Sequence, residues 1–88
     1  MQKHFNIKIK GHVQGVFFRV LAKEKADELG ITGFVRNESD GSLYIEAEGE
    51  ASNLDRFLAW CRQGPKSAGV EDVEVSESEM RGFVEFSL

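Results

Sequence analysis

The chain has 88 residues, of which 41% are hydrophobic and 30% charged, and its formal net charge at pH 7 is −4. This balance predicts one compact globular domain over residues 1–88 and excludes a disordered or fibrous chain. The acidic charge argues against nucleic-acid binding, the single cysteine excludes an internal disulfide framework, and the lack of a long apolar run excludes a membrane-spanning helix.

The first half of the chain predicts a strand, a helix and a β-hairpin. Apolar and polar residues alternate over residues 5–9, which is the pattern of a half-buried strand. Apolar residues at helical spacing then predict a helix from about Phe18 to Leu29, with Gly30 as its C-terminal stop. Two further strands, joined by a turn at Asp40-Gly41, are predicted over residues 31–37 and 43–48.

The second half predicts another helix and two more strands. Ser52 fits the N-cap of this helix, and Gly64-Pro65 ends it. Alternating valines predict a strand over residues 70–75 with a bulge or an irregular start, and residues 83–88 predict a short terminal strand. The buried stripe of the helix consists of Leu54, Phe57, Leu58 and Cys61.

The order strand, helix, strand, strand, helix, strand predicts the split βαβ arrangement of ferredoxin-like α+β folds. Such a βαββαβ sandwich has two helices on one face of a mainly antiparallel sheet, here with a short C-terminal strand added. The strands over residues 5–9 and 31–37 would run parallel, with residues 43–48 between them. We therefore expect the segment 11–19 and Asn37 at the same edge of the sheet, roughly 10 Å apart.

The segment 11–19, GHVQGVFFR, has the composition of an anion-binding loop. It places two glycines and Arg19 between a strand and a helix start, where free backbone N–H groups carry partial positive charge. Taken alone, Arg19 could be an ordinary surface arginine and Asn37 a turn residue. However, a positive side chain at a helix start faces the helix dipole unfavourably, which indicates a bound anion.

Two segments together resemble the signatures of the acylphosphatase family. The segment 9–19, IKGHVQGVFFR, resembles the family's signature loop, and the segment 33–37, GFVRN, followed by Asp40-Gly41 and Gly49, resembles its second signature. The likeness covers nearly the whole chain. It implies an enzyme that hydrolyses the carboxyl-phosphate bond of small acyl phosphates to a carboxylate and inorganic phosphate, without a metal or another cofactor.

The resemblance also implies the roles of individual residues. Arg19 and Asn37 would be catalytic: the Arg19 guanidinium would grip the phosphate, and the Asn37 carboxamide would hold the attacking water. Backbone N–H groups would wrap the remaining phosphate oxygens. These phosphate-binding groups belong to Gln14, Gly15, Val16, Phe17 and Phe18.

Other residues invite chemical roles that the sequence does not favour. His12 could be a nucleophile, but no carboxylate is placed to orient its ring. Cys61 is expected to be a buried structural thiol, and His4 an exposed strand residue. Glu46 and Glu48 alternate with apolar residues, which predicts a solvated strand face. Three cationic side chains are expected to be exposed and to attract an anionic substrate: Lys8, Lys10 and Arg36. Three aromatic side chains could line the site: Phe17, Phe18 and Phe34.

We therefore expect a free-standing, monomeric, cytoplasmic acylphosphatase. The main alternative is a non-catalytic module that binds a phosphorylated ligand or carbamoyl phosphate, as acylphosphatase-like domains do within larger enzymes. The absence of a partner domain between Met1 and Leu88 favours the independent enzyme. Nucleic-acid binding through stacked bases is a third alternative, but Tyr44 is a lone aromatic among acids on its strand.

Overall fold

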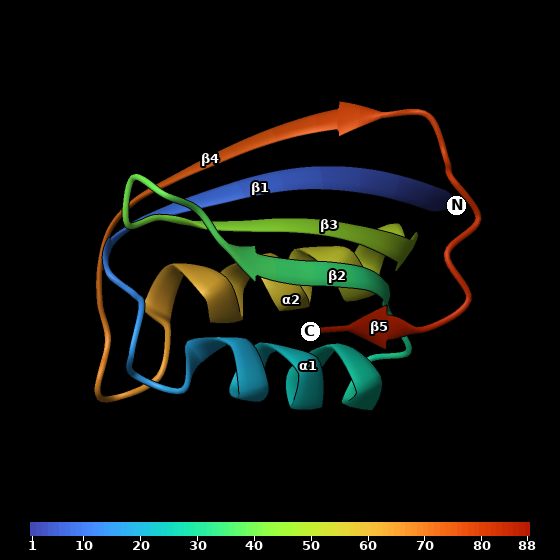
Figure 1. Ribbon diagram of the computed structural model, residues 1–88. Coiled ribbons are helices and arrows are strands. Elements are labelled where there is room, and N and C mark those ends of the chain that lie inside the picture. Colours follow the sequence, from blue (N-terminus) through green and yellow to red (C-terminus); the bar gives the residue numbers. More distant parts are fainter.

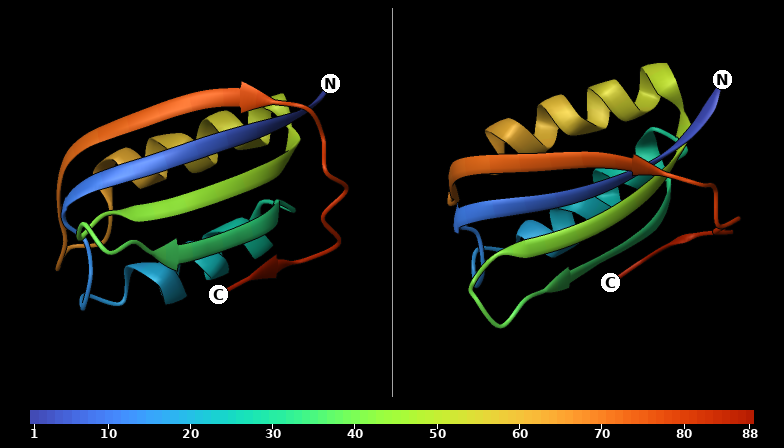
Figure 2. Two further views of the ribbon diagram at one scale, coloured as in Figure 1. Left: turned by 45° about the horizontal axis from the view of Figure 1, so that its top comes forward. Right: turned by 90° about the horizontal axis from the view of Figure 1, so that it is seen from above.

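The structure, a computed structural model, describes all of residues 1–88. Its strands form one five-stranded sheet in the order β4-β1-β3-β2-β5, and both helices cover one face of that sheet (Figures 1 and 2). All neighbouring strands are antiparallel except β2 and β5. The predicted ferredoxin-like α+β sandwich is therefore confirmed. The elements are β1 (Gln2–His12), α1 (Phe18–Glu28), β2 (Thr32–Asn37), β3 (Leu43–Glu50), α2 (Ala51–Gln63), β4 (Gly69–Ser78) and β5 (Phe86–Ser87).

The core lies between the sheet and the two helices. Every second residue of β1 and β3 points toward the helices, and Ile7 and Ile45 face each other there with no exposed surface. The helices contribute Phe18 and Phe57, which are also fully covered. Burial of such side chains contributes about 1.5–3 kcal/mol each. No helix has the length and apolar character needed to cross a membrane.

Most elements differ from the sequence prediction by one or more residues at their ends, and the start of α2 and the length of β5 differ in ways that matter for the fold. The helix α2 begins at Ala51, directly after the extended residue Glu50, so Ser52 lies inside the first turn and is not the N-cap. The N–H of Ala51 instead donates to the carbonyl of Met1, which means that the residue before β1 satisfies a donor at this helix start. The strand β5 is limited to Phe86–Ser87.

The expected bulge lies where β4 passes the end of β1. Lys10 pairs with Asp72 and Gly11 pairs with Val70, so that one residue of β4 is left over. Gly11 has φ 129°, and a Cβ atom there would collide with the backbone of Gly69 and Glu71. Gly11 is thus needed for the close approach of β4.

The face of the sheet opposite the helices is partly buried, contrary to prediction. His4, Glu46 and Glu48 lie on this face and are only 1%, 6% and 2% exposed. The segment 79–85 leads from β4 to β5 past the end of the sheet (Figure 1). Its residues contact all three side chains: Gly82 and Phe83 donate to Glu48, the Phe83 ring stacks on His4, and Arg81 pairs with Glu46. The Nδ1 atom of His4 lies 2.7 Å from Oε2 of Glu48, and its Nε2 atom lies 3.0 Å from Oε1 of Glu46.

Candidate active site

The loop between β1 and α1 is attached to the core by buried side chains, and part of its backbone is strained. Val13 and Val16 are buried in the core, and the hydroxyl of Ser67 donates to the carbonyl of Val16 over 3.0 Å. Gly15 (φ 73°) and Phe17 (φ 62°) both adopt left-handed backbone conformations. Such a conformation is routine for glycine but unfavourable for phenylalanine, and strain of this kind concentrates at functional sites.

The backbone N–H groups of residues 14–20 have no hydrogen-bond acceptor within the chain. The first N–H of this region that is satisfied belongs to Leu21, which donates to the carbonyl of Phe17 over 3.1 Å. The helix α1 has no side-chain cap at its N-terminus and no acidic residue in its first turn. These free donors, here called the N–H cradle (residues 14–20), add to the positive end of the helix dipole and favour an anion.

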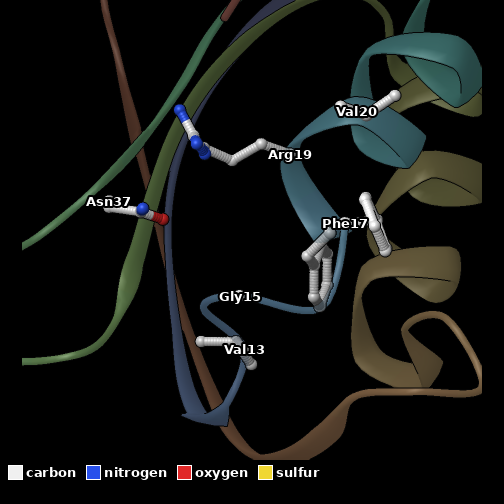
Figure 3. A pocket seen from close by; sticks show the side chains of 7 residues that line it. Val13, Gly15, Phe17, Arg19, Val20 and Asn37 are labelled. Atoms are coloured by element: carbon white, nitrogen blue, oxygen red, sulfur yellow. The ribbon is translucent and has the colours of Figure 1, made fainter.

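Arg19 and Asn37 extend toward each other from α1 and β2 across a cavity of about 360 Å³ (Figure 3). Arg19 is exposed and forms no ion pair, and the Asn37 carboxamide has no hydrogen-bond partner within the chain. β1 and β2 run parallel on either side of β3, so the loop after β1 and the end of β2 meet at one edge. The expected juxtaposition of these two side chains is confirmed.

The other predicted phosphate-binding residues divide into two groups. Gly15, Phe17 and Phe18 line the cavity together with Arg19 and Asn37. Gln14 and Val16 do not line it, although their N–H groups belong to the cradle.

One wall of the cavity is apolar and open to solvent. Phe17 is 76% exposed and Val20 is 48% exposed, and both line the cavity. Exposed apolar side chains that line a cavity beside a few polar groups are typical of a surface that contacts an apolar part of a ligand. Phe34, which the sequence also offered as a wall, packs instead against Tyr44 and Phe83 on the far face of the sheet.

The lining contains no histidine, cysteine or carboxylate. His12 is exposed at the end of β1 but does not line the cavity. Cys61 is buried in the core, as expected, and this burial raises the pKa of its thiol. Chemistry in the cavity must therefore depend on positive charge, hydrogen bonds and positioning.

The neighbouring cations are compensated by carboxylates. The pairs are Lys8 with Asp40 at 2.9 Å, Lys10 with Glu74 at 2.8 Å, and Arg36 with Glu38 at 3.4 Å. Hydrogen bonds from Ser42 and Lys8 lower the pKa of Asp40, so this carboxyl remains charged and keeps its partner neutralised. The general attractive field expected from these three cations is therefore weakened, and the unpaired Arg19 provides the positive side chain of the site.

The side chain of Gln14 makes contacts that the sequence did not predict. Its Nε2 atom donates to the carbonyl of Glu38 over 2.8 Å and to the carbonyl of Ser42 over 2.9 Å. Both acceptors belong to the hairpin loop (residues 38–42), which follows Asn37 directly. No local pattern reveals such a contact, because its partners lie 24 and 28 residues away in the chain.

Comparisons with known proteins agree with this site and fold. The acylphosphatase family model matches residues 5–88. An acylphosphatase of Methylococcus capsulatus is 46% identical over 87 residues, which cover 98% of this chain and 95% of that protein. The crystal structure of acylphosphatase from Bacillus subtilis matches with a TM-score of 0.95 and 35% identity, covering 100% of this chain and 98% of that one.

A longer protein contains a similar unit. Full-length HypF, in its phosphate- and nucleotide-bound form, matches 99% of this chain with a TM-score of 0.92 and 31% identity, but the match covers only 12% of that chain. The near-complete match to the Bacillus subtilis acylphosphatase shows that the same fold also forms a whole small protein. On the family model and on these identities, the chain belongs to the acylphosphatase family of enzymes.

Proposed function

We propose that the protein hydrolyses small acyl phosphates to a carboxylate and inorganic phosphate, and that the cavity between Arg19 and Asn37 is its active site. One observation carries this proposal: an unpaired guanidinium, an unpartnered carboxamide and most of the residues with free backbone N–H groups line the same cavity. Membership of the family supports the reaction class. The apolar wall accounts for the acyl group of such a substrate.

The N–H cradle and Arg19 bind the phosphoryl group. A planar guanidinium donates two parallel hydrogen bonds to phosphate oxygens, and the backbone N–H groups, including that of Gly15, surround the rest. These donors are already in place, so they stabilise the negative charge on the phosphoryl oxygens as the bonds at phosphorus rearrange. Phosphoryl transfer depends chiefly on such charge stabilisation and on alignment.

Asn37 positions the attacking water. Its carboxamide both accepts and donates hydrogen bonds, and it faces Arg19 from the opposite side of the cavity (Figure 3). The water oxygen forms a bond to phosphorus as the bond from phosphorus to the carboxyl oxygen breaks on the opposite side. Because no residue of the lining is a base at neutral pH, the proton of the water passes to the substrate, whose carboxylate is a good leaving group.

The proposal extends to the setting of the reaction. We propose that residues 1–88 act as one monomeric domain, without a metal or another cofactor, in the cytoplasm. The match over nearly the whole length of a small acylphosphatase supports the single domain. Gel filtration at assay concentration tests the monomer, and a single-domain monomer of 9.9 kDa is expected.

The test is hydrolysis of benzoyl phosphate by the purified protein in the presence of EDTA. We expect turnover by the wild type and a loss of kcat of about 100-fold or more in Arg19→Ala and in Asn37→Ala, because each removes a preorganised contact to the reacting groups. Arg56→Ala and Asn53→Ala are matched controls on α2. Neither control residue lines the cavity, and both variants are expected to retain full activity.

Two results would contradict the proposal. Full activity of Arg19→Ala or Asn37→Ala, with the fold intact by circular dichroism, would remove that residue from the mechanism. Measurable affinity for phosphate without hydrolysis above the uncatalysed rate would favour the non-catalytic binding module, a role consistent with the match to one part of the much longer HypF chain.

A further inference from the structure

Gln14 joins the two halves of the proposed active site through its side chain. A primary amide nitrogen carries two hydrogens, and Gln14 uses one for the carbonyl of Glu38 and the other for the carbonyl of Ser42. These two carbonyls belong to the first and last residues of the hairpin loop. The N–H of Glu38 also donates to the carbonyl of Ser42 over 2.9 Å. The backbone N–H of Gln14 meanwhile belongs to the N–H cradle.

Contacts that do not involve the Gln14 side chain stabilise each half of the site. Burial of Val13 and Val16 holds the cradle to the core. In the hairpin loop, the N–H of Gly41 donates to the carbonyl of Glu38, and Asp40 accepts hydrogen bonds from both the N–H and the hydroxyl of Ser42. The Gln14 amide therefore does not hold either half together; it connects them.

A second contact to the hairpin loop does not replace this connection. The Lys8–Asp40 pair joins the loop to β1, on the face of the sheet away from the helices. Both side chains are substantially exposed, at 36% and 54%, and exposed pairs of this kind contribute little to stability. The half-buried Gln14 amide thus provides the contact between cradle and hairpin loop that lies beside Asn37.

We propose that Gln14 is a positioning residue that sets the separation between the phosphate bound in the cradle and the water held by Asn37. This inference rests on the proposed hydrolysis. Alignment of a nucleophile within about 1 Å governs rates by factors of about 100, so a side chain that touches no substrate can still control kcat. Loss of the contact would leave phosphate binding intact and misalign the water.

The test compares kcat with phosphate affinity in Gln14→Met, which keeps the length of the side chain and removes both donors. We expect kcat for benzoyl phosphate to fall by about 10- to 100-fold, and the Ki of inorganic phosphate as a competitive inhibitor to change by less than about twofold. Gln14→Leu, which also removes both donors and adds no charge beside the cradle, is a second variant with the same expectation should Gln14→Met fold poorly. Lys8→Met is the matched control and is expected to keep the wild-type kcat.

A double-mutant cycle shows whether Gln14 acts through Asn37. In the Asn37→Ala background, Gln14→Met is expected to cause no further loss of kcat, because there is no positioned water left to misalign. Wild-type kcat in Gln14→Met, a parallel loss of kcat and phosphate affinity, or an undiminished loss in the Asn37→Ala background would each overturn the positioning role. Absence of hydrolysis by the wild type would instead overturn the proposed function, and this inference with it.

Discussion

At the scale of the residue, Phe17 is the least expected feature of the site. It adopts a left-handed backbone conformation that costs a non-glycine residue about 1–2 kcal/mol, and its aromatic ring is 76% exposed. Neither feature favours folding. Together they place a large apolar surface on the wall of the cavity, directly before the first turn of α1, which has no side-chain cap.

Phe17→Ala is expected to reduce the preference for an aromatic acyl group. The ratio of kcat/KM for benzoyl phosphate to kcat/KM for acetyl phosphate should fall by about five- to tenfold, since an aromatic contact contributes about 1 kcal/mol beyond burial of its area. Steady-state kinetics with the two substrates measures this ratio. An equal loss for both substrates would show that Phe17 shapes the cradle and does not contact the acyl group.

At the scale of the element, the segment 79–85 depends on one carboxylate. Glu48 accepts hydrogen bonds from the backbone N–H groups of Arg81, Gly82 and Phe83, and the ring of Phe83 stacks on His4. Burial opposes ionisation of Glu48, but the hydrogen bonds from Arg81 and from His4, Phe83 and Gly82 outweigh it and lower its pKa. Glu48 thus fixes a segment that lacks regular structure of its own.

Glu48→Gln is expected to lower the free energy of unfolding by about 2 kcal/mol at neutral pH, because the amide cannot accept all these hydrogen bonds. A lowered pKa in the folded state stabilises the protein above the ordinary pKa of about 4.3 and loses this effect as the pH falls through the folded value. The difference between wild type and variant should therefore shrink below about pH 4. The ionisable groups that face Glu48 are His4, which contacts it directly, and Arg81 with its partner Glu46.

Urea denaturation at several pH values measures this difference. Glu74→Gln is the control, because Glu74 also has a lowered pKa, owing to its hydrogen bond from Lys10, but lies exposed on β4. A stability difference for Glu48→Gln that is constant between pH 7 and pH 3 would show that packing, and not the ionised carboxylate, holds the segment 79–85.

At the scale of the whole molecule, the C-terminal strand completes the sheet beside β2. Phe86 is 2% exposed, packs on Phe57 of α2, and accepts a hydrogen bond from Lys23 of α1 at its carbonyl. The N–H of Gly33 donates to the carbonyl of Glu85. β5 therefore ties together both helices and the strand that carries Asn37, although it consists of only two residues.

Phe86→Ala is expected to lower the free energy of unfolding by about 3–5 kcal/mol, because it leaves a cavity among both helices and the sheet. Small domains have a total stability of about 5–15 kcal/mol, so the melting temperature should fall sharply. Thermal unfolding followed by circular dichroism measures this fall. Val84→Ala, at a side chain 91% exposed, should change little, and a small effect of Phe86→Ala would mean that β5 is dispensable for the fold.

The sequence alone predicted the order and kind of the elements, because alternation and helical spacing are local properties of strands and helices. The resemblance to a family singled out Arg19 and Asn37 as site candidates, and the split βαβ order placed them at one sheet edge, since it leaves few arrangements of the strands. The wrong predictions concern burial and one helix start. Glu46 and Glu48 alternate with apolar residues just as solvated positions do, although both are buried. The N–H of Ala51 at the start of α2 is satisfied by the carbonyl of Met1, a partner 50 residues away that no local pattern shows.

Tertiary structure decided which polar side chains have partners. Glu48 is buried because the segment 79–85, more than 30 residues later in the chain, packs against it as it runs past the end of the sheet. The side chain of Gln14 contacts the hairpin loop because the carbonyls of the first and last residues of that loop both accept hydrogen bonds from its amide. Local patterns report the face on which a residue lies, whereas its burial and its hydrogen bonds depend on what the rest of the chain places against that face.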